Sequence, residues 1–255
     1  MRAGVTFTEL DASPAGLRAL KRFYSALYIR EFPDPHERES LANMARYLAL
    51  KAQGWYGANN YHVLLMHRGG KVVGGSVSDY LAKPNAGVIE FLFTKRGQRG
   101  RGLGRALLDA TVRLLQRDAR AAGGKPLAAV VGEMNDPFRR PGTPDNMDPF
   151  VRAGIWGKLG FGRIDFPYVQ PALSSKQRPV DCLALVAKLP RGARAAVRSK
   201  WVIDVVAEYM RWAMRIPRPS GNAQYRDMRR YAAAHPVLAV VPLRRYVRGA
   251  ARKAA

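Results

Sequence analysis

An apolar segment, a loop of alternating glycine and arginine, and an amphipathic segment follow one another between Val88 and Leu115. The residues 87–95, GVIEFLFTK, have the β-branched and aromatic composition of a strand. Four apolar residues of the last segment recur with the period of a helix: Leu103, Leu107, Ala110 and Leu114. The chain is therefore predicted to pass from a strand into a helix within the loop KRGQRGRGLGR at 95–105.

The glycines at 100, 102 and 104 fall where the first turn of that helix must form. A glycine loop between a strand and a helix N-terminus presents backbone N–H groups to an anion, and phosphate is the usual one. The loop is not a Walker A motif, and Arg105 stands where the dinucleotide fingerprint has its third glycine. The alternative is a tight strand-to-helix turn with solvated arginines. A disordered arginine–glycine segment would have polar, low-complexity flanks, which are absent from this sequence.

The rest of the first 190 residues alternates strand and helix patterns, which predicts an α/β domain with a partly antiparallel sheet. Ser13-Pro14 is a typical helix start, with serine as the N-cap and proline in the first turn. Further helices are expected at 37–53 and 149–159. Strands are expected at 5–10, 60–68, 71–81, 87–95, 127–134, 161–171 and 180–189.

Two motifs in this region resemble those of the Gcn5-related N-acetyltransferases (GNAT). Arg99-Gly100-Arg101-Gly102-Leu103-Gly104 is similar to the family's Arg/Gln-x-x-Gly-x-Gly/Ala signature, and Leu159-Gly160-Phe161 is similar to its Leu-Gly-Phe motif. The resemblance covers about residues 4–189. It implies a mixed, mostly antiparallel twisted sheet of the GNAT type with flanking helices. It also implies an acyl-CoA:amine N-acyltransferase that uses acetyl-CoA or another acyl-CoA as donor.

The same resemblance implies roles for the glycine loop and the strand before it. The amides of residues 100–105 would hold the pyrophosphate of coenzyme A, and the pantetheine arm would lie between the strands at 88–95 and 127–134. Phe93 and Thr94 would supply the backbone N–H for the acyl oxygen. The expected cofactor-binding residues are Phe93, Thr94, Arg99, Gly100, Arg101, Gly102, Leu103, Gly104 and Arg105.

Three residues are candidates for proton transfer. Glu90 lies on the strand before the loop and is a candidate general base, or else a solvated or arginine-paired carboxylate. Glu133 ends the next expected strand and is the second candidate base, or else a carboxylate that caps a loop. At the position of the family's general-acid tyrosine this chain has Trp156, which cannot protonate a thiolate. Either the thiolate leaves unprotonated or another group acts as the acid, and Tyr168 is the candidate for that group, with a plain core aromatic as the alternative.

The charge of the chain is strongly positive, with 43 basic and 19 acidic residues and a net charge of +24. Such a field attracts polyanions. Residues 191–255 hold 15 of the basic and 3 of the acidic residues, so a quarter of the chain carries half of the excess. This shift predicts a boundary near Pro190, between a GNAT-like domain at 1–190 and a basic helical C-terminal extension at 191–255.

The extension carries an apolar face at helical spacing, and helices are expected at 197–216, 221–234 and 237–250. The face consists of Val197, Trp201, Val205, Tyr209, Trp212 and Ile216. It packs on the catalytic domain or on a second subunit in a homodimer, binds an acidic partner such as an acyl carrier protein or RNA, or lies on an anionic membrane.

The remaining residues restrict the chemistry. The four histidines have no metal-ligand spacing, so no metal is expected, and the single cysteine, Cys182, excludes an internal disulfide. The sequence lacks a signal-peptide pattern and an apolar run of about 18 residues, and a cytoplasmic location is the expectation. In FPDPHERES, the carboxylates of Asp34, Glu37 and Glu39 would suit a cationic amine acceptor, or they belong to a solvated turn.

Three functions are consistent with these observations. The first is N-acyl transfer from a coenzyme A thioester to an amine. The second takes the acyl or aminoacyl group from an acidic carrier protein or tRNA that docks on the basic surface. The third is a basic binding module without catalysis.

Overall fold

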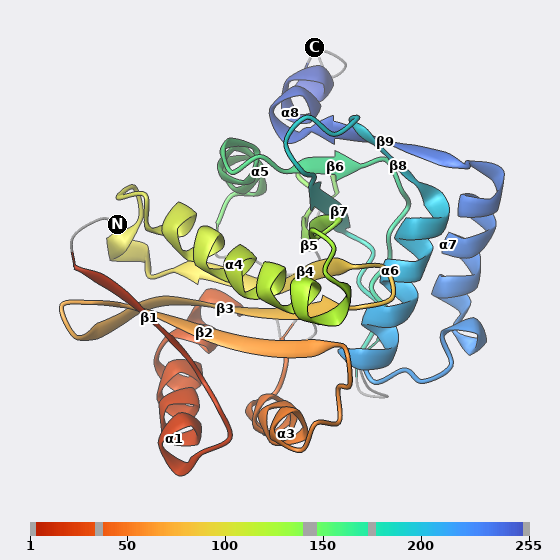
Figure 1. The fold of residues 1–255 in the computed structure, drawn as a ribbon. Helices are drawn as coiled ribbons and strands as arrows, with labels where there is room; N and C mark the ends of the chain where they lie inside the picture. Colours follow the sequence, from red (N-terminus) through yellow and green to blue (C-terminus); the bar gives the residue numbers. More distant parts are fainter. Residues whose placement is uncertain (1–3, 34–37, 140–146, 173–176, 252–255) are drawn as a thin grey trace. The chain divides into compact units, whose positions relative to one another are not determined.

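The computed structural model describes residues 4–33, 38–139, 147–172 and 177–251 (Figure 1). The chain folds as two compact units. The first comprises Met1–Ala82 and Gly87–Leu127, and the second comprises Lys83–Ala86 and Ala128–Ala255.

The strands of the first unit follow one another in space in sequence order, β1-β2-β3-β4. Their bounds are Val5–Glu9 for β1, Asn60–Arg68 for β2, Lys71–Leu81 for β3 and Ala86–Thr94 for β4. The pairs β1–β2 and β2–β3 are antiparallel. In the hairpin between β2 and β3 both Gly69 and Gly70 have positive φ, which explains the glycine pair in this tight turn.

The helices of the first unit lie on both faces of its strands (Figure 1). They are α1 (Pro14–Phe23), the π-helical turn η1 (Tyr24–Tyr28), α2 (Ile29–Glu31), α3 (Leu41–Ala52), the 3₁₀ turn η2 (Arg96–Gln98) and α4 (Leu103–Gly123). The predicted cap of α1 is confirmed, because Ser13 Oγ accepts a hydrogen bond from Gly16 N at 3.1 Å. The predicted helix 37–53 begins at Leu41, where Ser40 Oγ accepts from Asn43 N at 3.1 Å.

Side chains of β2 alternate between the two faces, as the period of a strand requires. Leu64 and Met66 pack with Leu103 and Leu107 of α4, whereas Tyr61 packs against Tyr47 of α3 with 5.4 Å between ring centres. The core of the first unit therefore has an aliphatic side under α4 and an aromatic side under α1 and α3.

The strands of the second unit have the order β5-β7-β6-β9-β8, and their recorded pairings are antiparallel. Their bounds are Ala129–Asn135 for β5, Gly162–Ile164 for β6, Leu183–Lys188 for β7, Ala196–Arg198 for β8 and Val237–Pro242 for β9. The helices are α5 (Pro149–Lys158), α6 (Ser199–Trp212), the 3₁₀ turn η3 (Pro219–Gly221), α7 (Ala223–Ala234) and α8 (Leu243–Ala251).

Three predicted elements of this unit are wrong in part. The helix predicted at 197–216 is shortened to Ser199–Trp212, because Ala196–Arg198 is the strand β8, which pairs with β9. The strand predicted at 161–171 is reduced to Gly162–Ile164. Pro167 and Pro171 cannot donate to a ladder, and of the later residues only Gln170 forms an isolated bridge, to Val180. The helix predicted at 237–250 begins only at Leu243, because Val237–Pro242 is a strand that pairs with β6 and β8.

The mixed α/β class with a mostly antiparallel sheet and flanking helices is confirmed. The predicted boundary at Pro190 stays a prediction, and β9, which follows it, pairs with β6, which precedes it. The apolar face of the extension packs within the second unit, where Val205 and Tyr209 of α6 are buried and Trp201 Nε1 donates to Pro84 O at 2.9 Å. No helix in the described ranges is both long and apolar enough to cross a membrane.

Candidate active site

The glycine loop turns the chain from β4 into α4. Gly100 has φ +80° and Gly102, the N-cap of α4, has φ +72°, a region that is strained for any side chain with a Cβ. The next residue, Leu103, is buried and packs with Leu64, Met66 and Val73. The two glycines thus shape the turn, while Leu103 fixes the start of the helix to the core.

The exposed side of this turn suits an anion. Within the described part of the chain no side chain caps the N-terminus of α4, which therefore carries the partial positive charge of the helix dipole. A Cβ added at Gly100 or Gly104 would meet no atom within 4 Å. Arg101 and Arg105 are exposed on the same turn. Bare backbone, open space and cationic side chains together fit a phosphate group.

The other predicted donor-binding residues mainly hold the loop in place. The Arg99 guanidinium forms an ion pair with Glu31 at 2.6 Å, and its Nε donates to Thr94 O at 3.2 Å. Phe93 is buried and its ring stacks on that of Phe23, with 5.6 Å between their centres. Arg99 and Phe93 therefore support the turn through their side chains, and a contact of either with a donor stays a prediction.

In the second unit, two residues that sequence reasoning selected separately lie in contact. The Tyr168 hydroxyl donates a short hydrogen bond to the carboxylate of Glu133 on β5. Tyr168 is only 1% exposed. Burial, and then the charge of Glu133, raise the pKa of Tyr168 well above its ordinary value, so the phenol keeps its proton at neutral pH. The pair joins a proton donor to a proton acceptor.

Trp156 has a packing role. Its ring meets the ring of Phe161 edge-on, with 4.6 Å between the centres. Between them α5 ends and Gly160 adopts φ +94°, as expected for the glycine after a helix. The Leu-Gly-Phe motif is thus a helix stop, in which both Leu159 and Phe161 are buried.

The acidic residues near the start of α3 have different positions. The Glu39 carboxylate accepts hydrogen bonds from Ser40 N, Asn43 Nδ2 and Tyr47 OH, so it stabilises the first turn of α3. Asp34 and Glu37 lie outside the described residues. Glu90 on β4 is half-buried, and its charge helps raise the pKa of Tyr28 and of Tyr61, after the larger effect of their burial.

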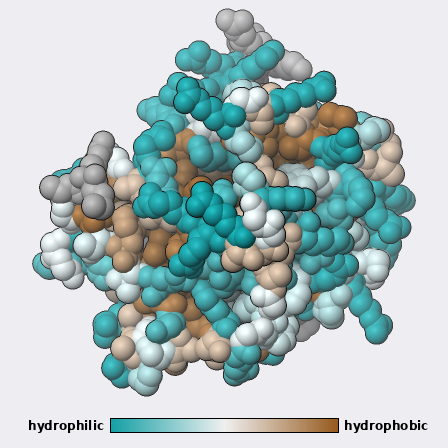
Figure 2. Space-filling model, viewed as in Figure 1, coloured by the Kyte–Doolittle hydropathy of each residue, from teal (hydrophilic) through white to brown (hydrophobic). Residues whose placement is uncertain are grey.

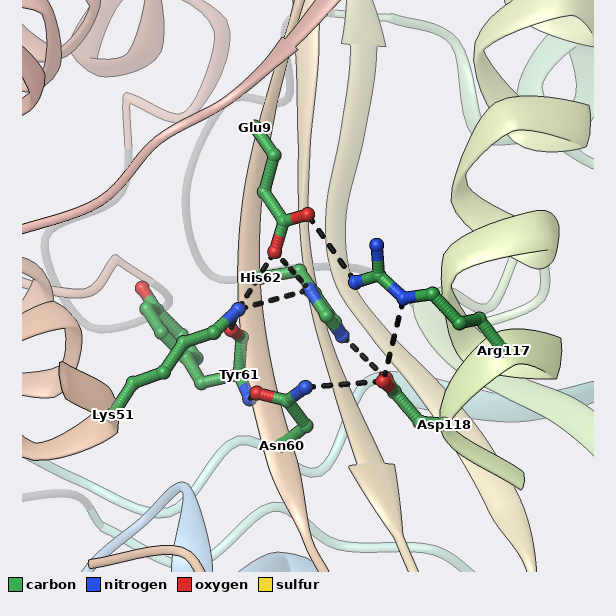
Figure 3. A network of polar contacts seen from close by, with 7 residues as sticks. All are labelled: Glu9, Lys51, Asn60, Tyr61, His62, Arg117 and Asp118. Carbon is green, nitrogen blue, oxygen red and sulfur yellow. Dashed lines mark hydrogen bonds and ion pairs between the residues drawn. The ribbon is translucent and has the colours of Figure 1, made fainter. Parts of the chain in front are cut away.

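His62 is a buried polar residue for which the sequence suggested no role (Figure 3). Its Nδ1 lies 2.7 Å from Glu9 Oε1 and its Nε2 lies 2.5 Å from Asp118 Oδ2. Lys51 Nζ also contacts Glu9, at 2.6 Å. The sequence signal that could have identified His62 is the two-residue alternation of β2, which places it on the apolar face of the strand with Leu64 and Met66. Among the residues that the structure describes, neither Glu9, His62 and Asp118 nor any other group of acidic, histidine or cysteine side chains is arranged to hold a metal ion.

A family comparison agrees with these features. Residues 20–137 match the model of the acetyltransferase (GNAT) family. This segment runs from α1 to the end of β5 and includes the glycine loop and Glu133. The protein carries a GNAT acetyltransferase domain. The expectation of an acyl-transferring enzyme of this family is thereby confirmed, and the identity of its substrates is a separate question.

Solved structures agree with the GNAT assignment at the level of the fold. One is a protein from Bacteroides thetaiotaomicron assigned to the GNAT family, with a TM-score of 0.57 and 16% identity, covering 81% of this chain and 98% of its own. Another is a tandem GNAT protein from the clavulanic acid biosynthesis pathway, with a TM-score of 0.51 and 17% identity, covering 89% of this chain and 66% of its own. Among curated proteins, none matches the sequence.

Proposed function

We propose that this GNAT protein is an N-acyltransferase that moves an acetyl or other acyl group from a coenzyme A thioester to an amine by direct attack. The observation that carries the proposal is the uncapped N-terminus of α4 behind Gly100 and Gly102. Bound acyl-CoA would supply the activated carbonyl carbon and the thiolate leaving group. The loop amides after Gly100 and the side chains of Arg101 and Arg105 would hold its phosphates.

Glu133 and Tyr168 provide what the proton transfers require. The amine must be deprotonated to attack, because an alkylamine has a pKa of about 10.4. As the N–C bond forms and the C–S bond breaks, Glu133 takes a proton from the amine nitrogen and Tyr168 gives one to the sulfur. The hydrogen bond between the two side chains then returns a proton from Glu133 to Tyr168. Glu90 is the other candidate base, directly or through water.

The test uses a charge placed at the start of α4. In Gly104→Asp a carboxylate enters open space in the first turn without backbone strain, since Gly104 does not have a positive φ. It should weaken binding of acetyl-CoA by about tenfold or more, because like charges in a partly desolvated site repel by about 1.4 kcal/mol or more. The measurement is calorimetric titration with acetyl-CoA.

Gly97→Asp is the matched control. It makes the same charge change at another glycine with open space around its Cβ and without positive φ, before the helix begins. Its affinity for acetyl-CoA should stay within about threefold of the wild type. Equal affinities of the two variants would overturn the assignment of this loop to the donor.

A second candidate function keeps the chemistry and changes the donor to an acyl or aminoacyl group on an acidic carrier protein or tRNA. Its support is a set of exposed arginines on α7 and α8: Arg226, Arg229, Arg230, Arg244, Arg245 and Arg248. Hydrophilic residues cover α7 on the face in Figure 2. This charge exceeds what a small donor with a few phosphate charges requires.

A further inference from the structure

The Arg99 side chain of the glycine loop contacts two other elements of the first unit. Its guanidinium forms an ion pair with Glu31 of α2 at 2.6 Å, and its Nε donates to Thr94 O at the end of β4 at 3.2 Å. The side chain of Arg99 is 26% exposed and that of Glu31 is 11% exposed. Water and salt therefore screen this pair less than they screen an ion pair on the open surface.

Glu31 is held in place by the aromatic residues before and after it. It follows the π-helical turn η1, whose wider hydrogen-bonding spacing changes the direction in which the next residues point. Tyr28 meets the Phe91 ring edge-on, with 4.9 Å between ring centres. The ring centre of Phe32 lies 4.7 Å from that of Phe91 and 5.6 Å from that of Phe93. Glu31 is thus fixed against β4, the strand that leads into the glycine loop.

The backbone that follows Arg99 needs such an anchor. Gly100 and Gly102 have φ +80° and +72°, and glycine loses more conformational freedom on being ordered than any other residue. Several N–H groups must point to one place to bind a phosphate, and the free energy of ordering them is subtracted from the affinity unless they are ordered beforehand. Arg99 directly precedes Gly100, so its contacts restrict the loop before a ligand arrives.

The charge of Glu31 also favours a geometric role. A carboxylate beside an anion-binding loop would by itself repel a phosphate. The ion pair adds no net charge to the loop, because Glu31 and Arg99 neutralise each other. Arg101 and Arg105 are the exposed cations of the same turn. The pair therefore contributes the shape of the loop, and the other two arginines contribute its positive charge.

We infer that Glu31 is a positioning residue for the acyl donor, which acts through Arg99 by holding the backbone before α4 in the conformation that binds the phosphates. The inference rests on the proposed function for the identity of the ligand, but the effect of Glu31 on the loop can be measured in the free protein. If Arg99 instead left Glu31 to contact a phosphate, removal of the carboxylate would release the arginine and tighten binding. The two roles thus predict opposite signs.

The first measurement is hydrogen exchange of the full chain without ligand. The informative amides are those of Gln98, Arg99 and Ala106, which donate to Lys95 O, Arg96 O and Gly102 O within the turn. In Glu31→Gln, which keeps the shape of the side chain and removes its charge, they should exchange at least about fivefold faster. The amides of β2 should exchange at the wild-type rate, which shows that the variant is folded. Asp109→Asn, at an exposed residue of α4, should leave all these rates within about twofold of the wild type.

The second measurement is calorimetric titration with acetyl-CoA, together with steady-state kinetics. Glu31→Gln should weaken binding and raise KM for acetyl-CoA by about fivefold or more, while kcat stays within about twofold of the wild type. Arg99→Gln should weaken binding at least as much, because it also loses the contact with Thr94. The double variant should bind no more weakly than Arg99→Gln alone, since Glu31 acts through Arg99.

Three results would overturn the inference: unchanged exchange of the three amides in folded Glu31→Gln, unchanged or tighter binding of acetyl-CoA by that variant, or additive losses in the double variant. If Glu31→Gln does not fold, Arg99→Gln, at the more exposed partner, takes its place in both measurements. Faster exchange in Glu31→Gln, with no binding of acetyl-CoA by the wild type, would overturn the proposed function and leave the anchoring of the loop by Glu31 standing.

Discussion

Replacing His62 should destabilise the protein more than any surface change, because both ring nitrogens contact carboxylates, Glu9 on one side and Asp118 on the other (Figure 3). A neutral imidazole has only one N–H, so donation to both acceptors requires the imidazolium. The three residues connect β1, β2 and α4, and Lys51 adds α3 through its contact with Glu9. The network therefore joins four elements of the first unit.

The size of the effect follows from burial. The His62 side chain has 0% exposure, and a buried ion pair that loses one partner typically costs about 3–5 kcal/mol. His62→Gln keeps one hydrogen bond and loses the charge, so about 3 kcal/mol is expected. For a protein of this size, that corresponds to a fall in Tm of roughly 6–12 °C.

The pH dependence has a definite sign. Burial opposes the charge on His62, but hydrogen bonds with Asp118 and Glu9 outweigh it and raise the pKa of His62. The stabilisation is therefore fully present below the unfolded pKa of about 6.5 and is lost as the pH rises through the higher folded value. Burial also acts to raise the pKa of Glu9, but hydrogen bonds from His62 and Lys51 hold it well below its usual range. That contribution is present above about pH 4.3 and is lost as the pH falls.

Urea unfolding of the wild type and of His62→Gln between pH 5 and pH 10 measures the size and the pH dependence of the His62 contribution. The difference in unfolding free energy between the two proteins should be largest near pH 5.5 to 6.5 and should shrink at higher pH. His235→Gln, at an exposed histidine of the second unit, is the control and should change stability by less than about 0.5 kcal/mol. A cost below about 1 kcal/mol for His62→Gln, or a difference that grows with pH, would refute the account of a charged, doubly bonded imidazole.

Two further predictions concern catalysis and the basic surface. Glu133→Gln should lower kcat by about 10²–10⁴-fold with little change in acetyl-CoA affinity. Tyr168→Phe should flatten the alkaline side of the pH–rate profile. Full activity of both variants at neutral pH would exclude Glu133 and Tyr168 from proton transfer. Replacing the six exposed arginines of α7 and α8 by glutamine should reduce the salt dependence of tRNA binding. The rate of reaction between a free amine and acyl-CoA should stay the same. If the wild type binds no tRNA at physiological salt, a tRNA donor is contradicted.

The local elements of the first unit were predictable because their signals agree. The predicted strands 60–68 and 71–81 have the observed bounds, since two apolar runs flank a glycine turn. Ser13 and the glycine loop were equally legible, because a cap and a positive φ depend on a few neighbouring residues. Where a few neighbouring residues decide the backbone conformation, the sequence was sufficient to predict it.

The segment Val237–Pro242 shows where local reasoning stops. VLAVVP is short and apolar, and such a run is compatible with a helix or a strand. Its conformation is decided by β6, whose Gly162 pairs with Pro242, and by β8, whose Val197 pairs with Leu238. The basic, amphipathic residues that follow do form a helix, but the helix pattern does not extend back through β9.

In the candidate site, the sequence pattern predicts that a buried polar residue has a partner, but it does not identify the partner. A polar side chain on the apolar face of a strand must find a partner, because its burial is otherwise too costly. The position of His62 beside Leu64 therefore implies that acceptors exist, but not that they are Glu9 and Asp118, which are 53 and 56 residues away in sequence. Glu133 and Tyr168 were selected for their chemistry and position in the motif order, and their contact depends on how the chain after β6 returns to β5. Which distant residues come into contact depends on the order of the strands in the sheet. The structure shows this order, and the sequence alone does not.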